Sequence, residues 1–231
     1  MSIPVYYVGG SKGGVGKSVV SIALVDYLNL NNLDPLPIET DTANPDVAAL
    51  YEDQTVFADL DERDGWLEML KHIEDNPDRI VVVNSAARAN TGLEKYGKDL
   101  LFDALREMGR PCDAFWVVNR TKDSVSMLAD FLQMTAGSIP VHVVRNLYFG
   151  PSHKFELLNT SNTLEKARAT GGKTLDFPDL ADRVYEKMNV QRMNVEQALQ
   201  PGVLSVGDMV ELRRWRQEAH LRFAEVIGDG Q

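Results

Sequence analysis

A glycine-rich loop near the N-terminus constrains the fold of this chain more than any other feature. The run GGSKGGVGKS at residues 9–18 follows the apolar segment 3–8 and opens a stretch of helical period at 16–31. Glycines let successive backbone N–H groups turn toward an anion, and the N-terminus of the following helix adds positive charge. A loop of this kind between a strand and a helix predicts a phosphate-binding loop (P-loop) in an α/β fold.

The residue types in this loop assign it to a nucleoside triphosphate. Lys17 supplies charge to the β and γ phosphates, and the Ser18 hydroxyl is placed to ligate Mg²⁺. The predicted nucleotide-binding residues of the loop are Gly13, Gly14, Val15, Gly16, Lys17 and Ser18.

Alternating apolar runs and helical stretches predict a three-layer α/β fold, a mostly parallel twisted sheet flanked by helices. The expected strands are about 3–8, 35–39, 79–84, 113–119 and 140–145. The expected helices are about 16–31, 64–75, 93–108, 122–135, 154–170, 179–198 and 205–227. With 231 residues, the chain is predicted to be one nucleotide-binding domain over 1–231, with 154–231 as a mainly helical C-terminal portion.

Composition and charge limit the other classes of function. The N-terminus lacks a secretory pattern and no segment reaches about 18 apolar residues, so we expect a cytoplasmic protein that does not bind membranes. The lone cysteine, Cys112, excludes an internal disulfide and is expected to be a packing residue. A net charge of -10 disfavours nucleic-acid binding by the whole surface.

The basic stretch of the last predicted helix, around Arg213, is the candidate for a local DNA contact. Acidic residues are interleaved with it, and apolar residues recur at helical spacing (Val210, Leu212, Leu221, Ala224). That pattern favours docking on the core or a partner, so that any DNA contact would be indirect.

Within the loop, a second lysine, Lys12, stands early, and Ser11 replaces the glycine of the strict pattern. The segment KGGVGKS resembles the deviant Walker A motif of the ParA/MinD family, in the SIMIBI class of P-loop NTPases. The resemblance implies an ATP-dependent homodimer in which Lys12 reaches the partner's nucleotide, and catalytic roles for Lys12 and Lys17. A second ammonium group has little to neutralise at one triphosphate, which also favours a role toward another subunit; a solvated lysine is the alternative.

The segment 38–46 follows the second strand, at the sheet edge where its carboxylates can reach the γ-phosphate or its Mg²⁺. It resembles the family's first switch, which assigns Asp41 to catalysis, as the residue that orients the attacking water, and to the metal site. Glu39 and Thr42 depart from the family's aspartate and proline. An Asp41 that only caps the next helix is the alternative.

The run 79–87 resembles a Walker B strand, but Asn84 stands where the family has aspartate. An amide brings no negative charge to the metal. We therefore expect weak ATPase activity, unless Glu39 compensates for the missing negative charge. A nonfunctional nucleotide site is an alternative.

Asn146 follows the last predicted strand and resembles the asparagine that contacts adenine in this family. Its amide offers both a donor and an acceptor, and no Asn-Lys-x-Asp motif is present, so ATP is favoured over GTP.

The first 90 residues or so also resemble the TraL or StbB-like proteins of conjugative plasmids. The resemblance implies a slowly hydrolysing switch that positions or segregates plasmid DNA or a transfer complex and answers to a regulating partner protein. The alternatives are an ATP-dependent scaffold without turnover and a P-loop phosphotransferase or ligase acting on a small molecule.

Overall fold

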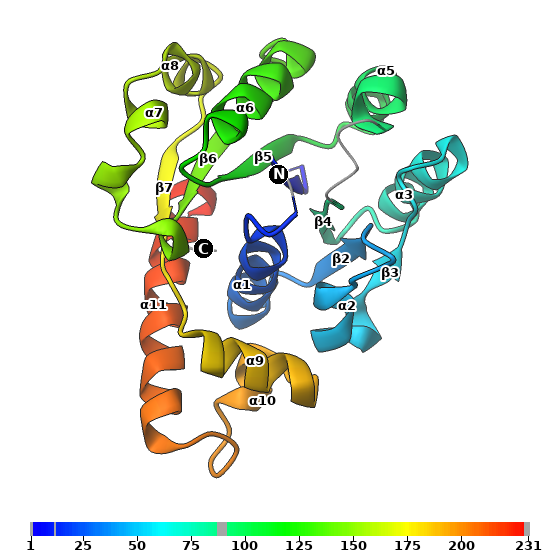
Figure 1. Ribbon diagram of the computed structural model, residues 1–231. Helices are drawn as coiled ribbons and strands as arrows, with labels where there is room; N and C mark the ends of the chain where they lie inside the picture. Colours follow the sequence, from blue (N-terminus) through cyan, green and yellow to red (C-terminus); the bar gives the residue numbers. More distant parts are fainter. Residues whose placement is uncertain (1, 12, 87–91, 229–231) are drawn as a thin grey trace.

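The computed structural model describes residues 2–11, 13–86 and 92–228. In this part of the chain, seven parallel strands form one sheet in the order β3-β2-β4-β1-β5-β6-β7 (Figure 1). The strands are β1 (Val5–Gly10), β2 (Pro35–Glu39), β3 (Val56–Phe57), β4 (Ile80–Asn84), β5 (Cys112–Val118), β6 (Val141–Asn146) and β7 (Thr174–Phe177).

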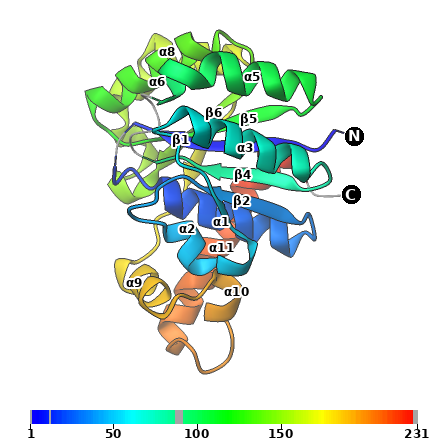
Figure 2. The same ribbon diagram turned by 90° about the vertical axis from the view of Figure 1, so that its right-hand side faces the viewer.

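Helices cover both faces of the sheet, which confirms the predicted three-layer α/β fold (Figure 2). The helices are α1 (Lys17–Leu30), α2 (Asp46–Leu50), α3 (Arg63–Asp75), α5 (Lys98–Glu107), α6 (Lys122–Thr135), α7 (Glu156–Asn159), α8 (Asn162–Ala169), α9 (Asp182–Gln191), α10 (Val195–Ala198) and α11 (Val206–Ile227). Short 3₁₀ turns lie at Glu52–Gln54, Leu147–Phe149 and Ser152–Lys154, and a π-helical turn at Leu93–Gly97 precedes α5.

Alternating residues of each strand feed two hydrophobic layers. In β1, Tyr7 packs toward α3, α5 and α6 and stacks on Phe131, while Tyr6 faces α1 and α11 and meets Phe115 edge to face. Because side chains alternate across a strand, a sheet covered on both faces needs such continuously apolar strands. The short β-branched run of β4 is buried for the same reason.

The predicted helix and strand pattern missed two strands. The two-residue strand β3 extends the edge beside β2, and β7 lies inside the portion expected to be mainly helical. In β7, only Leu175 and Phe177 are fully buried, and four residues are too few to show a period. At the turn before it, a Cβ on Gly172 would lie 1.9 Å from the Val141 carbonyl oxygen, so the close approach of the two backbones requires glycine.

Two expected helices are interrupted. The range 154–170 contains a 3₁₀ turn, α7 and α8, because the chain turns at Thr160 and Ser161 caps α8 through its side chain. In the same way, 179–198 is divided between α9 and α10, where Arg192 takes a left-handed conformation and Asn194 forms a capping box with Gln197. The helix α2 was not predicted.

The buried face of α11 agrees with the predicted one only in part, since Leu212 is buried and Ala224 packs against the core. Val210 and Leu221 are 58% and 61% exposed, whereas Leu212, Trp215, Ala219 and Phe223 are buried against α1 and the sheet. The docking of this helix on the core is therefore correct, but the stripe that docks is turned around the helix axis.

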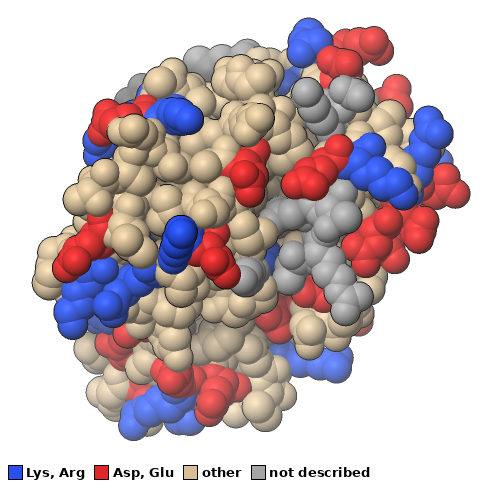
Figure 3. All heavy atoms as spheres, turned by 45° about the horizontal axis from the view of Figure 1, so that its top comes forward, with Lys and Arg blue, Asp and Glu red and all other residues tan. Residues whose placement is uncertain are grey.

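Acidic and basic side chains are intermixed on the face in Figure 3. Salt bridges also join neighbouring residues along the helices, for example Arg106 with Asp103 on α5 and Arg168 with Glu165 on α8. This face shows no continuous area of basic side chains (Figure 3).

Candidate functional site

The glycine-rich loop links β1 to α1 at the carboxyl edge of the sheet. Since all strands are parallel, the segments after β1, β2, β4, β6 and β7 converge at that edge. The connection order reverses beside β1, where β4 lies on one side and β5 on the other. This is the topological position at which open α/β sheets bind ligands.

The loop conformation depends on glycine. Gly14 and Gly16 have φ angles of 77° and 99°, a left-handed region that other residues rarely adopt, and Gly16 is the N-cap of α1. Ser11, which replaces the glycine of the strict pattern, is buried and its hydroxyl donates to Ser124 Oγ at 3.0 Å. The substitution therefore attaches the loop to the start of α6.

Lys17 is 7% exposed at the first position of α1. Burial lowers the pKa of Lys17, and the negative charges of Asp41 and Glu39 oppose that shift. The ammonium group is thus close enough to Glu39 and Asp41 for their charges to act on it. Lys12, the predicted second lysine of the site, lies outside the described residues.

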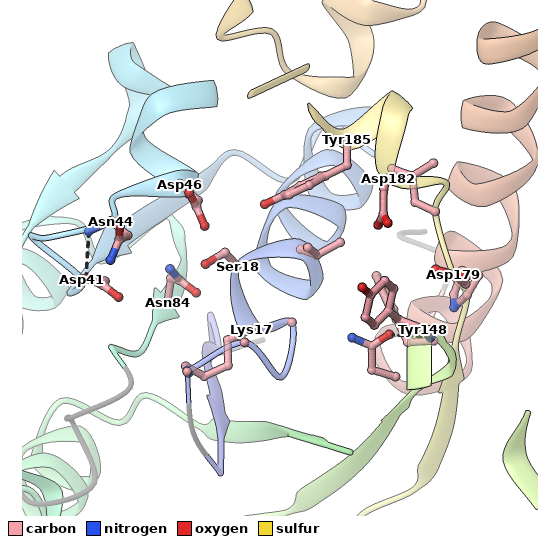
Figure 4. Close-up of a pocket in the computed structure, with 18 of the residues that line it drawn as sticks. Lys17, Ser18, Asp41, Asn44, Asp46, Asn84, Tyr148, Asp179, Asp182 and Tyr185 are labelled. Carbon is pink, nitrogen blue, oxygen red and sulfur yellow. Dashed lines mark hydrogen bonds between the residues drawn. The ribbon is translucent and has the colours of Figure 1, made fainter. Parts of the chain in front are cut away.

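The loop forms one end of a cleft of about 560 Å³ (Figure 4). The cleft is lined by Gly13, Gly14, Gly16, Lys17, Ser18, Val19, Asp41, Asn44, Asp46, Asn84, Ser85, Asn146, Tyr148, Phe177, Pro178, Asp179, Leu180, Asp182 and Tyr185. Most of the residues predicted from sequence lie on it, and Val15 lies buried behind it. A cleft of this volume fits the range of small-ligand sites.

Two carboxylates approach the Ser18 end of the cleft. Asp41 Oδ1 accepts hydrogen bonds from the N–H groups of Ala43 and Asn44, at 3.2 and 3.0 Å, so this carboxylate shapes the loop after β2 as well as lining the cleft. Asp46, at the start of α2, lines the same cleft, and its side chain faces that of Ser18 (Figure 4). Burial raises the pKa of Asp46, whereas the neighbouring Ser18 hydroxyl lowers it.

These oxygens suit a hard divalent cation that also binds phosphate. Among the described residues, no group of three or more His, Cys, Asp and Glu side chains could hold a metal ion by itself. Mg²⁺ commonly takes one or two carboxylates and completes its shell with water and phosphate oxygens. The Ser18 hydroxyl and these carboxylates fit that requirement.

Glu39, which was expected to compensate for the charge that Asn84 lacks, lies buried beside Asn84. Its side chain is fully buried, Oε1 accepts from Asp41 N–H at 3.0 Å and from Asn84 Nδ2 at 2.9 Å, and Oε2 accepts from Val47 N–H at 3.2 Å. Burial raises the pKa of Glu39, and these hydrogen bonds lower it. Glu39 is thus bonded to Asn84 at the end of β4, and it is not among the described residues that line the cleft.

Asn146 braces the phosphate loop. Its Nδ2 donates to the Val15 carbonyl at 2.9 Å, and its Oδ1 accepts from Tyr148 N–H at 3.1 Å. A Cβ on Gly16 would lie 2.3 Å from the same Nδ2 atom. The residue predicted to contact a base therefore lies on the cleft with much of its amide already bonded to the protein.

The opposite wall of the cleft was missed by sequence reasoning. Tyr148 follows β6, Phe177 ends β7, and Pro178 to Leu180, Asp182 and Tyr185 follow it. The loop after β7 is held by α11, where Trp215 Nε1 donates to the Pro178 carbonyl at 3.1 Å. Because β7 was not predicted, no sequence pattern placed this loop at the carboxyl edge.

The fold and the glycine-rich loop define a P-loop α/β protein with a MinD-like fold. Two solved structures share this fold, MinD of Pyrococcus horikoshii complexed with Mg-ADP (TM-score 0.52, 14% identity, 98% of each chain) and a McdA variant of Cyanothece with ATP (TM-score 0.53, 9% identity, 100% of this chain and 98% of that chain). Protein MobD of Acidithiobacillus ferrooxidans is 42% identical over 221 residues, 95% of this chain and 96% of that protein. The chain therefore belongs to the MobD family. No family model matches it.

The described helices include none with the length and apolar character needed to cross a membrane.

Proposed function

We propose that the protein is an ATP-binding switch that uses Mg²⁺ and changes its association state with the nucleotide. The observation that carries the proposal is the cleft that joins the phosphate loop to the wall around Tyr148 and Tyr185. One end offers backbone N–H groups, Lys17 and Ser18 to phosphates, and the other offers aromatic and polar groups to a nucleoside. Nucleotide binding in MinD of the same fold supports this proposal.

Roles within the cleft follow from position. Lys17 would neutralise the β and γ phosphates, and Ser18 and Asp41 would hold Mg²⁺, which supplies charge neutralisation there when bound. Asp41 would also orient the attacking water, and Lys12 would reach the nucleotide of a second subunit. Asn146 would help to bind the base, because it holds the phosphate loop through the Val15 carbonyl and also lines the cleft. Its amide favours adenine over guanine.

The biological task we propose is positioning or segregating plasmid DNA or a transfer complex in the cytoplasm, as in the TraL or StbB-like proteins that the sequence resembles. A partner protein would regulate hydrolysis by the ATP-dependent homodimer. Intermixed charges on the face in Figure 3 and the buried stripe of α11 favour indirect contact with DNA.

A non-hydrolysing scaffold is a second candidate, and the bonding of Asn84 favours it. The amide donates to Glu39 and accepts from Ser21 Oγ at 2.9 Å, so the end of β4 brings no negative charge to the cleft. A scaffold of this kind would dimerise with ATP and release no phosphate.

The test is the molecular mass in solution with no nucleotide, with ADP and with a nonhydrolysable ATP analogue, together with phosphate release and competition by GTP. The variants are Lys12→Ala and Asp41→Ala, with the exposed Lys71→Ala on α3 as a matched control. The switch predicts an ATP-dependent dimer that Lys12→Ala abolishes and Asp41→Ala traps, with Lys71→Ala unchanged.

ATP-dependent dimerisation without phosphate release, with or without a partner protein, would favour the scaffold. A mass that is indifferent to nucleotide would overturn both candidates and leave the cleft without a switching role.

A further inference from the structure

The end of β4 leaves the cleft one carboxylate short. In P-loop NTPases, Mg²⁺ is generally held by the P-loop Ser or Thr and by an acid after this strand. Asn84 occupies that place, and its two amide atoms are bonded to Ser21 and Glu39. A metal held beside Ser18 therefore needs a carboxylate from another element of the fold.

Asp46 is placed to supply it. Its carboxylate lines the same cleft as Ser18, whose side chain supplies the hydroxyl expected on the metal. In Figure 4 the two side chains face one another, with Asn84 nearby on the loop side. In P-loop NTPases the metal ion is held by the loop hydroxyl together with an acid, so a carboxylate that faces this hydroxyl is in position to be a ligand.

The Asp46 side chain does not cap its own helix. Asp46 begins α2, but the N-cap of α2 is Pro45, without a side-chain cap, and the Asp46 N–H bonds the Asn44 carbonyl at 2.9 Å. Asp41 differs in this respect, since one of its oxygens accepts the two N–H groups of its own turn. The Asp46 side chain is turned toward Ser18 of the phosphate loop instead (Figure 4).

We infer that Asp46, rather than a residue of β4, supplies a second carboxylate that holds a divalent cation, together with Ser18 and Asp41, on the phosphates of a bound nucleotide. The inference rests on the proposed nucleotide-binding function and assigns the metal end of the same cleft. The ligand class is a hard divalent cation, Mg²⁺ or Mn²⁺, bridged to a di- or triphosphate.

The test is Mn²⁺ binding to the complex of the full chain with ADP, followed by electron paramagnetic resonance of free Mn²⁺. Asp46→Asn is compared with wild type and with Asp53→Asn, the same change at an exposed position outside the cleft. We expect Asp46→Asn to weaken Mn²⁺ binding by about tenfold or more, as loss of groups around a metal commonly does, and Asp53→Asn to leave it unchanged. ADP affinity in EDTA checks that the variant keeps its fold and cleft.

Three outcomes are distinct. Weaker Mn²⁺ binding with unchanged ADP affinity in EDTA supports the inference. Equal Mn²⁺ affinity in wild type and Asp46→Asn overturns it while nucleotide binding stands. A wild-type protein that binds no nucleotide overturns the proposed function and the inference together. If Asp46→Asn does not fold, the test uses Asp46→Glu, which keeps the charge and must retain Mn²⁺ binding.

Discussion

Arg216 of α11 donates two hydrogen bonds to the Asp26 carboxylate of α1, at 2.7 and 2.9 Å. Asp26 is buried in the helix that carries the phosphate loop, and His220 Nε2 lies 2.8 Å from the same carboxylate. Because Trp215, one residue earlier, bonds the Pro178 carbonyl, α11 connects the helix behind the phosphates to the loop at the other wall of the cleft. The C-terminal helix is thereby part of the architecture of the site.

The Asp26 contact predicts a large loss of stability on truncation. Asp26→Ala leaves Arg216, whose side chain is 15% exposed, without its main partner, and we expect the free energy of unfolding to fall by about 3 kcal/mol. Urea unfolding measures it. Glu225→Ala, which breaks an exposed pair with Arg222 on the same helix, should change stability by less than about 1 kcal/mol. Similar losses in the two variants would contradict the prediction.

Gly16→Ala should impair nucleotide binding. The new Cβ would lie 2.3 Å from Asn146 Nδ2 at a φ of 99°, so Asn146 must move and release the Val15 carbonyl. Left-handed strain of about 1–2 kcal/mol and the lost brace predict roughly a tenfold weaker affinity for ADP by calorimetry.

Gly109→Ala is the control for backbone strain alone. Its φ is 65°, a Cβ there meets no atom within 4 Å, and it lies at the end of α5, away from the cleft. It should lose stability of about 1 kcal/mol and keep its ADP affinity. Unchanged ADP affinity in Gly16→Ala would show that the Asn146 contact does not matter for binding.

Stability should depend on pH through Asp208. Hydrogen bonds from Lys187, Arg183 and Ser205 lower the pKa of this buried carboxyl below its usual value of 3.8. As pH falls, the unfolded chain therefore binds this proton at a higher pH than the folded chain does. The stabilisation that the Asp208 carboxylate gives the folded state is complete well above pH 3.8 and is lost as pH falls through the lowered pKa.

Thermal unfolding of wild type and Asp208→Asn between pH 3 and 7 checks this sign. The advantage of wild type should be constant near neutral pH and shrink as pH falls below about 5. Asp103→Asn, which removes an exposed carboxylate paired with Arg106, should show no such trend. An advantage that grows toward acid would contradict the assigned shift.

Local patterns were enough to predict much of the fold. Helix α6 spans the expected range. Its start is marked by Thr121, whose side chain accepts from Ser124 N–H. The run Val81–Val83 is a central strand since only residues buried on both faces are continuously apolar. The glycines of the phosphate loop identify it because the backbone conformation itself requires them.

Contacts between distant segments could not be predicted in this way. The four residues of β7 form a strand through pairing with β6, and the cleft wall that follows depends on Trp215, 37 residues later. The brace from Asn146 to Val15 spans 131 positions. Such pairs have no period or spacing in the sequence, so the base end and the Ser18–Asp46 pair emerge only in three dimensions.

The buried pair Asn84–Glu39 predicts the cost of restoring the missing acid. Asn84→Asp keeps the acceptor for Ser21 but places a second carboxylate at the site of a 2.9 Å donor to buried Glu39. We expect the free energy of unfolding to fall by about 2 kcal/mol at neutral pH. Because two carboxyls this close share a proton, the pair binds protons more readily when folded, and the loss should shrink as pH falls toward about 5.

The double variant Glu39→Gln with Asn84→Asp moves the negative charge from the buried position to the lining of the cleft. The new amide at position 39 can donate to the new carboxylate at position 84, so most of the stability lost in Asn84→Asp should return. The remaining loss comes from Asp41 N–H, which no longer has Glu39 Oε1 as its acceptor. The charge at the end of β4 should then tighten Mn²⁺ binding to the ADP complex. If Asn84→Asp alone is as stable as wild type at neutral pH, the amide is not what allows Glu39 to be buried as a carboxylate.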